Sequence, residues 1–129
     1  NKVGAVVANP LDIGTPMVPL ELFGKIMHRA AADPSTDILI FDMAVNFASD
    51  LVGEEGLLEA AEILASTRRE SGKPLAAVLY TRARDQGDAR SEELTRRLRS
   101  KLLGSRVAVF DSMASALKAI SRINIASPA

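Results

Sequence analysis

The sequence predicts an α/β fold in which an open parallel sheet lies between helices, in three α/β/α layers. One observation is that nearly continuous apolar runs recur along the chain, as is typical of strands buried on both faces of a parallel sheet. Another is that segments with apolar residues at helical spacing alternate with these runs. The resulting order is helix, strand, helix, strand, helix, strand, helix, which right-handed crossovers assemble into one parallel sheet.

Four segments carry the helical pattern, and their ends have recognisable signals. The first ends at Asp33, because a residue that precedes proline avoids helical angles. The second has acids early and arginines late, as a helix dipole favours, with Gly72 as its C-cap. The fourth has Asp111 or Ser112 as its N-cap. The segments cover residues 19–33, 54–72, 88–104 and 111–124.

Three apolar runs predict the strands, at residues 37–45, 73–81 and 105–110. Residues 11–13 can add a short extra strand, since Pro10 suits the start of an edge strand, where a missing N–H costs little. Asp42 lies inside the first run, and a buried acid needs a partner or a raised pKa. It is either a functional acid at the carboxyl edge of the sheet or a carboxylate satisfied by a neighbouring hydroxyl, amide or arginine. We favour the second interpretation.

The composition places limits on the class of protein. A chain of 129 residues, 47% hydrophobic, is expected to form one domain with a sizeable aliphatic core. It has no cysteine, which excludes disulfides, thiolate metal sites and a thiol nucleophile. No signal peptide or membrane-spanning run is visible, so we expect a cytoplasmic protein that does not enter the membrane. The opening NKVGAVVANP lacks an initiator Met, and we expect residues 1–129 to be a fragment of a longer multidomain chain.

The charges are unevenly distributed although they sum to zero. Residues 1–65 hold three Lys or Arg against ten Asp or Glu, and residues 66–129 hold thirteen against six. The third predicted helix carries Arg90, Arg96, Arg97, Arg99 and Lys101. Acids interleave with these cations and no aromatic side chain is near for base stacking. We therefore interpret this set as a solvated helix face, and nucleic-acid binding is not expected.

Most motifs that carry chemistry are absent from the sequence. It contains neither glycine-rich phosphate fingerprint and no nucleophile elbow. Its only histidine, His28, falls on the polar side of the first helix, without a second metal-binding residue nearby. The third strand lacks the lysine that a phosphoacceptor receiver domain requires. We therefore predict no catalytic residue and no metal site in this chain.

Three phrases occur in the sequence in this order, separated by predicted helices: NPLDIG, ADPSTDILIFDM and KPLAAVLY. Together they resemble the second flavodoxin-like ligase domain of the nucleoside-diphosphate-forming acyl-CoA synthetases. This is the superfamily of succinyl-CoA synthetase. The resemblance covers nearly the whole chain and implies a flavodoxin-like fold. It also identifies Asn9, Pro10 and Asp12 as the family motif where the chain enters this domain. Asp12 is expected to satisfy backbone donors of the turn at Gly14 and Thr15.

In that family a phosphohistidine carries the phosphoryl group, and the resemblance implies that this domain assists the ligation of an acid to CoA. The histidine, the CoA and the ATP or ADP with Mg lie on other domains or subunits, which would be the partners of this chain. None of these cofactors is expected on this domain, and the fragment alone is expected to be inactive. The residues implied to face the phosphoryl group form the loop of Ala44, Val45, Asn46, Phe47 and Ser49.

The sequence also departs from the family pattern. Succinyl-CoA synthetases have a Gly-Gly pair at about the position of Ala44 and Val45, and glycines are frequent where this chain has Thr81 and Arg82. Arg82 and Arg84 are then candidates to supply charge in place of backbone donors. An alternative is a non-catalytic regulatory or interaction module that kept the fold and lost the site. A third hypothesis is a binder of small ligands or nucleic acid that uses residues 82–101. A homo-oligomer is compatible with each of these.

Overall fold

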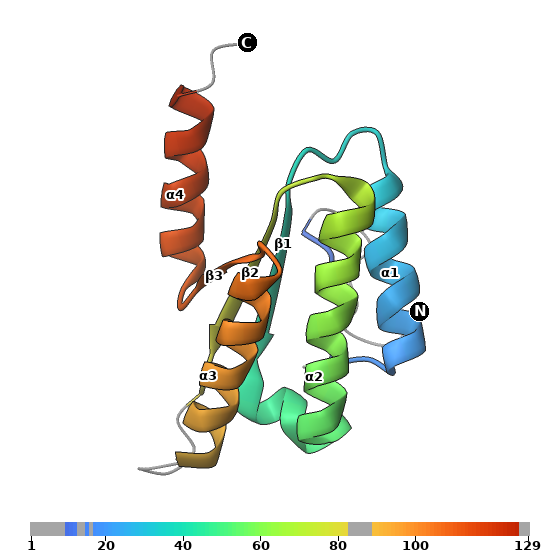
Figure 1. The fold of residues 1–129 in the computed structure, drawn as a ribbon, viewed down its shortest axis with the longest axis vertical. Coiled ribbons are helices and arrows are strands. Elements are labelled where there is room, and N and C mark those ends of the chain that lie inside the picture. The colour runs from blue at the N-terminus through green and yellow to red at the C-terminus, as the bar shows by residue number, and fades with distance from the viewer. Residues whose placement is uncertain (1–9, 13–14, 16, 83–88, 127–129) are drawn as a thin grey trace.

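In the described part of the chain, the sheet consists of three parallel strands in the order β1-β2-β3 (Figure 1). The computed structural model describes residues 10–12, 15, 17–82 and 89–126. The register pairs Leu39 with Leu75 and Ala76 with Ala108. The strands are β1 (Leu39–Ala44), β2 (Leu75–Tyr80) and β3 (Ala108–Phe110).

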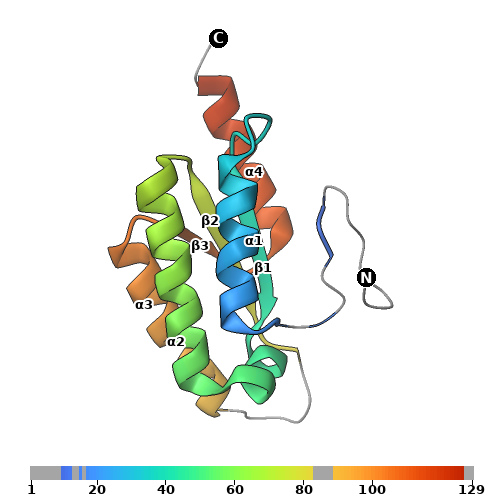
Figure 2. The ribbon, with the colours of Figure 1, turned by 90° about the vertical axis from the view of Figure 1, so that its right-hand side faces the viewer.

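Among the described residues, four helices cover the two faces of this sheet, which confirms the predicted three-layer α/β/α, flavodoxin-like architecture and its element order. They are α1 (Leu20–Ala32), α2 (Val45–Ser71), α3 (Ala89–Gly104) and α4 (Met113–Ala126). Figures 1 and 2 show α4 on the side of the sheet away from α1 and α2. Helix α3 lies on the same face of the sheet as α1 and α2. The crossovers from β1 to β2 and from β2 to β3 have the same hand and run in the same direction, so they place α2 and α3 on the same side.

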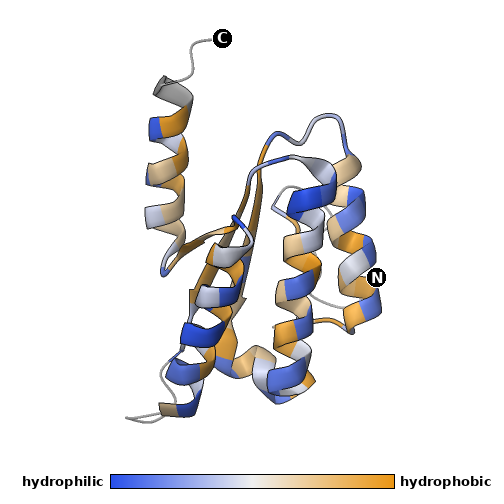
Figure 3. Cartoon of the chain, viewed as in Figure 1, coloured by the Kyte–Doolittle hydropathy of each residue, from blue (hydrophilic) through white to orange (hydrophobic). Residues whose placement is uncertain are grey.

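The main core lies between the sheet and helices α1 to α3. Because side chains alternate along a strand, every second residue of β1 and β2 faces this layer. Phe41 on β1 packs against Phe23 of α1 with ring centroids 5.0 Å apart. Helix α3 adds a stripe of leucines four residues apart, of which Leu94 and Leu98 belong to the same cluster. Figure 3 shows the strands in apolar colours, while the outward side of α3 is hydrophilic.

The ends of α1 and α2 and the start of α4 lie where the sequence places them. Helix α1 stops before Asp33, and Gly72 ends α2 in the left-handed conformation, with φ 68° and its N–H donated to the Arg68 carbonyl. The hydroxyl of Ser112 accepts the backbone N–H of Ser115 at 3.1 Å, so Ser112 is the cap of α4. Lys73 supports the end of α1 from a distance, donating to the Asp33 carbonyl at 2.8 Å.

The extra strand predicted at residues 11–13 is not found in the described part of that segment. Asp12 forms only an isolated β-bridge, and Ile13 lies outside the described residues. Leu11 is 49% exposed, so the segment buries little apolar surface that would hold it against the sheet. Pro10 also lacks the N–H that a ladder hydrogen bond needs.

Candidate functional site

The carboxyl edge of the sheet is where an open α/β fold places its ligands, and the predicted phosphate-facing residues lie there. The structure corrects one part of that prediction, because these residues do not form a loop. Ala44 is the last residue of β1, and α2 begins directly at Val45, so residues 45–52 are helical. The side chains of Ala44 and Val45 are buried, and the strand passes into the helix at these residues without an intervening loop.

Asn46 joins the first turn of α2 to the end of β2. Its side chain is 4% exposed. The amide nitrogen donates to the carbonyl of Arg82 at 2.7 Å, and the backbone N–H of Arg82 donates back to the amide oxygen at 3.0 Å. Both polar ends of the side chain are therefore used to hold the backbone that leaves β2. We call this pair of hydrogen bonds between Asn46 and Arg82 the clamp. Its structural role could not be predicted from the sequence.

Gly53 divides α2 into two segments. Its backbone has φ 73° and ψ 174°, a conformation that side chains disfavour. Packing at the break is tight, because a Cβ added at Gly56 would stand 2.8 Å from the Cβ of Val52. The segment before the break turns away from the long segment that covers the sheet, so a space opens between it and α3. Periodicity alone does not reveal this break, although the glycine is visible in the sequence.

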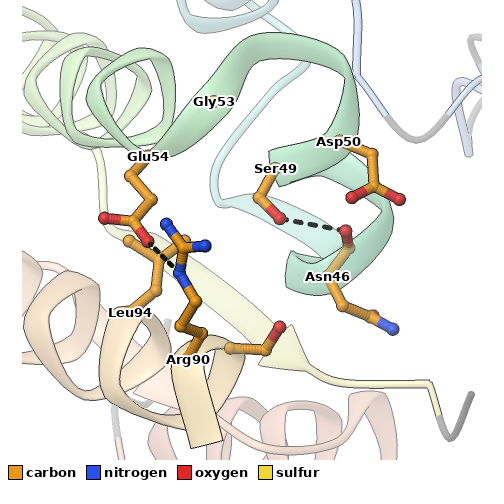
Figure 4. A pocket seen from close by; sticks show the side chains of 8 residues that line it. Asn46, Ser49, Asp50, Gly53, Glu54, Arg90 and Leu94 are labelled. Atoms are coloured by element: carbon orange, nitrogen blue, oxygen red, sulfur yellow. Dashed lines mark hydrogen bonds and ion pairs between the residues drawn. The ribbon is translucent and has the colours of Figure 1, made fainter. Parts of the chain in front are cut away.

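That space is a cavity of about 340 Å³ at the carboxyl edge (Figure 4). Asn46, Ser49 and Glu54 line it from α2, and the start of α3 lines it from the other side. Ser49 donates its hydroxyl to the Asn46 carbonyl at 3.0 Å. Arg90 lies 3.5 Å from Glu54, and Figure 4 shows this ion pair joining α3 to α2 among the residues that line the cavity. The lining is polar and carries both signs of charge.

Asp42 is satisfied by a neighbouring hydroxyl, as the favoured interpretation predicts. The hydroxyl of Tyr80 on the adjacent strand donates to Asp42 Oδ1 at 2.9 Å. Asp42 is nevertheless exposed rather than buried, because β1 lies at the edge of the sheet and α4 packs on β2 and β3. Partial burial is the largest cause that raises the pKa of Tyr80, and the hydrogen bond to Asp42 and the negative charge of Asp42 raise it further. The guanidinium of Arg82 opposes this shift.

This arrangement predicts the titration of the phenol. Tyr80 is the only tyrosine of the chain, so the tyrosinate absorbance reports this residue alone. We expect its midpoint above the ordinary 10.0, and the protein should lose stability as the pH rises from 10.0 towards the folded pKa, since the unfolded chain ionises first. The variant Asp42→Asn should move the midpoint down. A midpoint that is equal in both proteins would contradict the role of Asp42.

The remaining predicted residues fall into two groups. Asn9 of the family motif lies outside the described residues, as does Gly14 of the turn expected to receive Asp12; Pro10 and Asp12 are exposed. Arg84 also lies outside them. The basic face of α3 is solvated and partly paired, with Arg97 3.8 Å from Glu54 and Lys101 3.4 Å from Glu62. His28 is exposed and lies 3.7 Å from Glu70, as expected for a surface histidine.

The described residues offer neither a candidate metal site nor a candidate membrane-spanning helix. They contain no group of three or more His, Cys, Asp or Glu side chains that would hold a metal ion. None of their helices combines the length and apolar character needed to cross a membrane. Comparisons with protein-family models, with curated proteins and with solved structures each found no match to this chain.

Proposed function

We propose that this chain is a ligase-type flavodoxin-like domain of a nucleoside-diphosphate-forming acyl-CoA synthetase, and that it assists a phosphohistidine on another domain. The start of α2 carries this proposal. It lies at the carboxyl edge of the sheet, its N-cap Ala44 has no side-chain oxygen, and its first turn contains no acid. The helix's own first turn therefore leaves the positive end of the dipole without a carboxylate, which favours an approaching phosphoryl group.

The proposal also requires a surface on which the other domains dock. Helix α4 offers one, because Leu117 is 52% exposed and Ile123 is 59% exposed on a helix that packs only one side on the sheet. Exposed apolar side chains gathered on one element are typical of interaction surfaces. In the proposed assembly CoA, the nucleotide and Mg are bound by the neighbouring domains or subunits, and this domain contributes the helix terminus.

Phosphorylation of the intact protein tests this function. The protein that contains this domain would be incubated with γ-labelled ATP, and the expected product is an acid-labile, base-stable phosphate that CoA plus a carboxylic acid discharges. Ser49→Asp adds a carboxylate to the second turn of α2, beside the proposed phosphoryl position, and should lower the rate of labelling several-fold. Ser49→Ala is the matched control and should label normally.

A second candidate is a regulatory or interaction module without phosphoryl chemistry. The burial and the hydrogen bonds of the residues at the junction between β1 and α2 favour this candidate. The Val45 side chain is fully buried, and the amide of Asn46 is occupied by the backbone of Arg82. The same experiment separates the candidates, because a folded, nucleotide-binding protein that takes up no label would support the module and contradict the ligase.

A further inference from the structure

The chain changes sides of the sheet between its last two strands. The connection after β2 leads to α3, whose leucines pack in the core with α1 and α2. The connection after β3 leads to α4, which packs against β2 and β3 from the opposite face. Where neighbouring strands send their chains to opposite faces, the connections separate and leave a crevice at the carboxyl ends, the usual ligand position in open α/β sheets.

A cavity occupies this crevice. Strand β3 ends at Phe110, which pairs with Val78, but β2 continues for two residues to Tyr80. The end of β2 therefore has no strand beside it on that edge in the described part of the chain. The space there has a volume of about 430 Å³, within the range of small-molecule sites. It is lined by Leu79, Tyr80, Thr81, Glu92, Thr95, Arg96, Arg99 and Asp111.

The charged residues of this lining are not neutralised by one another. Arg96 is engaged by Glu93, with a contact of 2.7 Å. Within the described residues, however, no ion pair or hydrogen bond involves the side chain of Arg99, Glu92 or Asp111. A guanidinium and two carboxylates thus face one cavity without pairing. A ligand with only a negative charge would be repelled by the carboxylates, and a ligand with only a positive charge would be repelled by the guanidinium.

We propose that this crevice binds a small zwitterion, a free α-amino acid with an apolar side chain. Its carboxylate would pair with Arg99, in the bidentate manner that a guanidinium allows. Its ammonium group would lie towards Asp111 and Glu92, and its side chain towards Tyr80 at the end of β2. Charge complementarity favours this class of ligand over a phosphate ester. The phosphate could pair with Arg99, but Asp111 and Glu92 would then face a further negative charge.

Binding of L-leucine to the 129-residue chain tests the proposal by amide chemical shifts. We expect saturable shifts at Thr81, Thr95 and Asp111. Two analogues each remove one charge: 4-methylpentanoate lacks the ammonium group, and 3-methylbutylamine lacks the carboxylate. Both should bind at least tenfold more weakly. Equal binding of either analogue, no saturable shift with leucine, or binding of inorganic phosphate alone would overturn the proposal.

Variants connect the binding to the named side chains. Arg99→Met keeps the aliphatic stem and removes the charge, and Asp111→Asn keeps the shape; each should weaken leucine binding at least tenfold. Arg97→Met is the matched control on the same helix, since Arg97 lies near Glu54 and outside this cavity. Unchanged binding in Arg99→Met would contradict the assignment. Leucine shifts confined to Asn46 and Ser49 would also overturn it, without bearing on the ligase proposal.

Discussion

Replacing Asn46 with alanine is expected to lower the free energy of unfolding by about 2–3 kcal/mol. The variant loses both hydrogen bonds to the backbone of Arg82 and leaves the buried space of the amide empty. A typical hydrogen bond contributes about 1 kcal/mol to stability, and an abandoned buried partner costs more. The residues joined are 36 positions apart, so no local hydrogen bond replaces the clamp.

Urea unfolding measures this loss, and two further variants define its origin. Asn46→Asp keeps the acceptor for the Arg82 N–H but presents an oxygen to the Arg82 carbonyl, so we expect a loss of similar size. Ser49→Ala removes one half-buried bond to the Asn46 carbonyl and should cost less than about 1 kcal/mol. If Asn46→Ala cost no more than Ser49→Ala, the clamp would not be a stabilising feature.

The clamp also reaches the Tyr80 hydroxyl through Arg82. The guanidinium of Arg82 lowers the pKa of Tyr80, against the effects of burial and of Asp42. Releasing the backbone of Arg82 should weaken that influence, so the tyrosinate midpoint of Asn46→Ala is expected to lie above that of the unaltered protein. A loss of stability without any change in the titration would mean that Arg82 keeps its position without Asn46.

The elements of the fold are predictable from the sequence because their signals are local. The apolar runs locate β1 and β2 to within two residues at each end, and Asp33, Gly72 and Ser112 mark helix ends through their own backbone preferences. Exposure is harder to predict. The apolar run around Asp42 is typical of a strand covered on both faces, but coverage depends on where α4 packs, which is a tertiary property.

The candidate sites are less predictable because they are assembled from distant parts of the chain. The family resemblance gives the start of α2 only as a candidate, and the pairing of Asn46 with Arg82 depends on parallel strands meeting at one edge. The crevice beside Tyr80 arises because β3 is shorter than β2, a difference of length that apolar patterning does not specify. Arg99, which the sequence places on a solvated face, lines that crevice because α3 packs beside β2 and β3.

The second large effect is expected for Leu57→Ala, which should lower the free energy of unfolding by about 2–5 kcal/mol. Leu57 is fully buried and lies one turn after the break at Gly53, where α2 begins to cover the sheet. Truncation removes buried apolar surface and leaves a cavity that the helix cannot readily close, since Gly56 and Val52 are already in close contact.

Leu51→Ala provides the matched control, because Leu51 is the same residue type on the same helix but is 56% exposed and lies before the break. It should cost less than about 0.5 kcal/mol. Urea unfolding of the two variants compares a buried and an exposed leucine of α2 directly. Equal losses would mean that Leu57 is held no more firmly than an exposed side chain, and would contradict its place in the core. A large loss for Leu57 alone means that burial against the sheet, and not the loss of a leucine side chain as such, sets the cost.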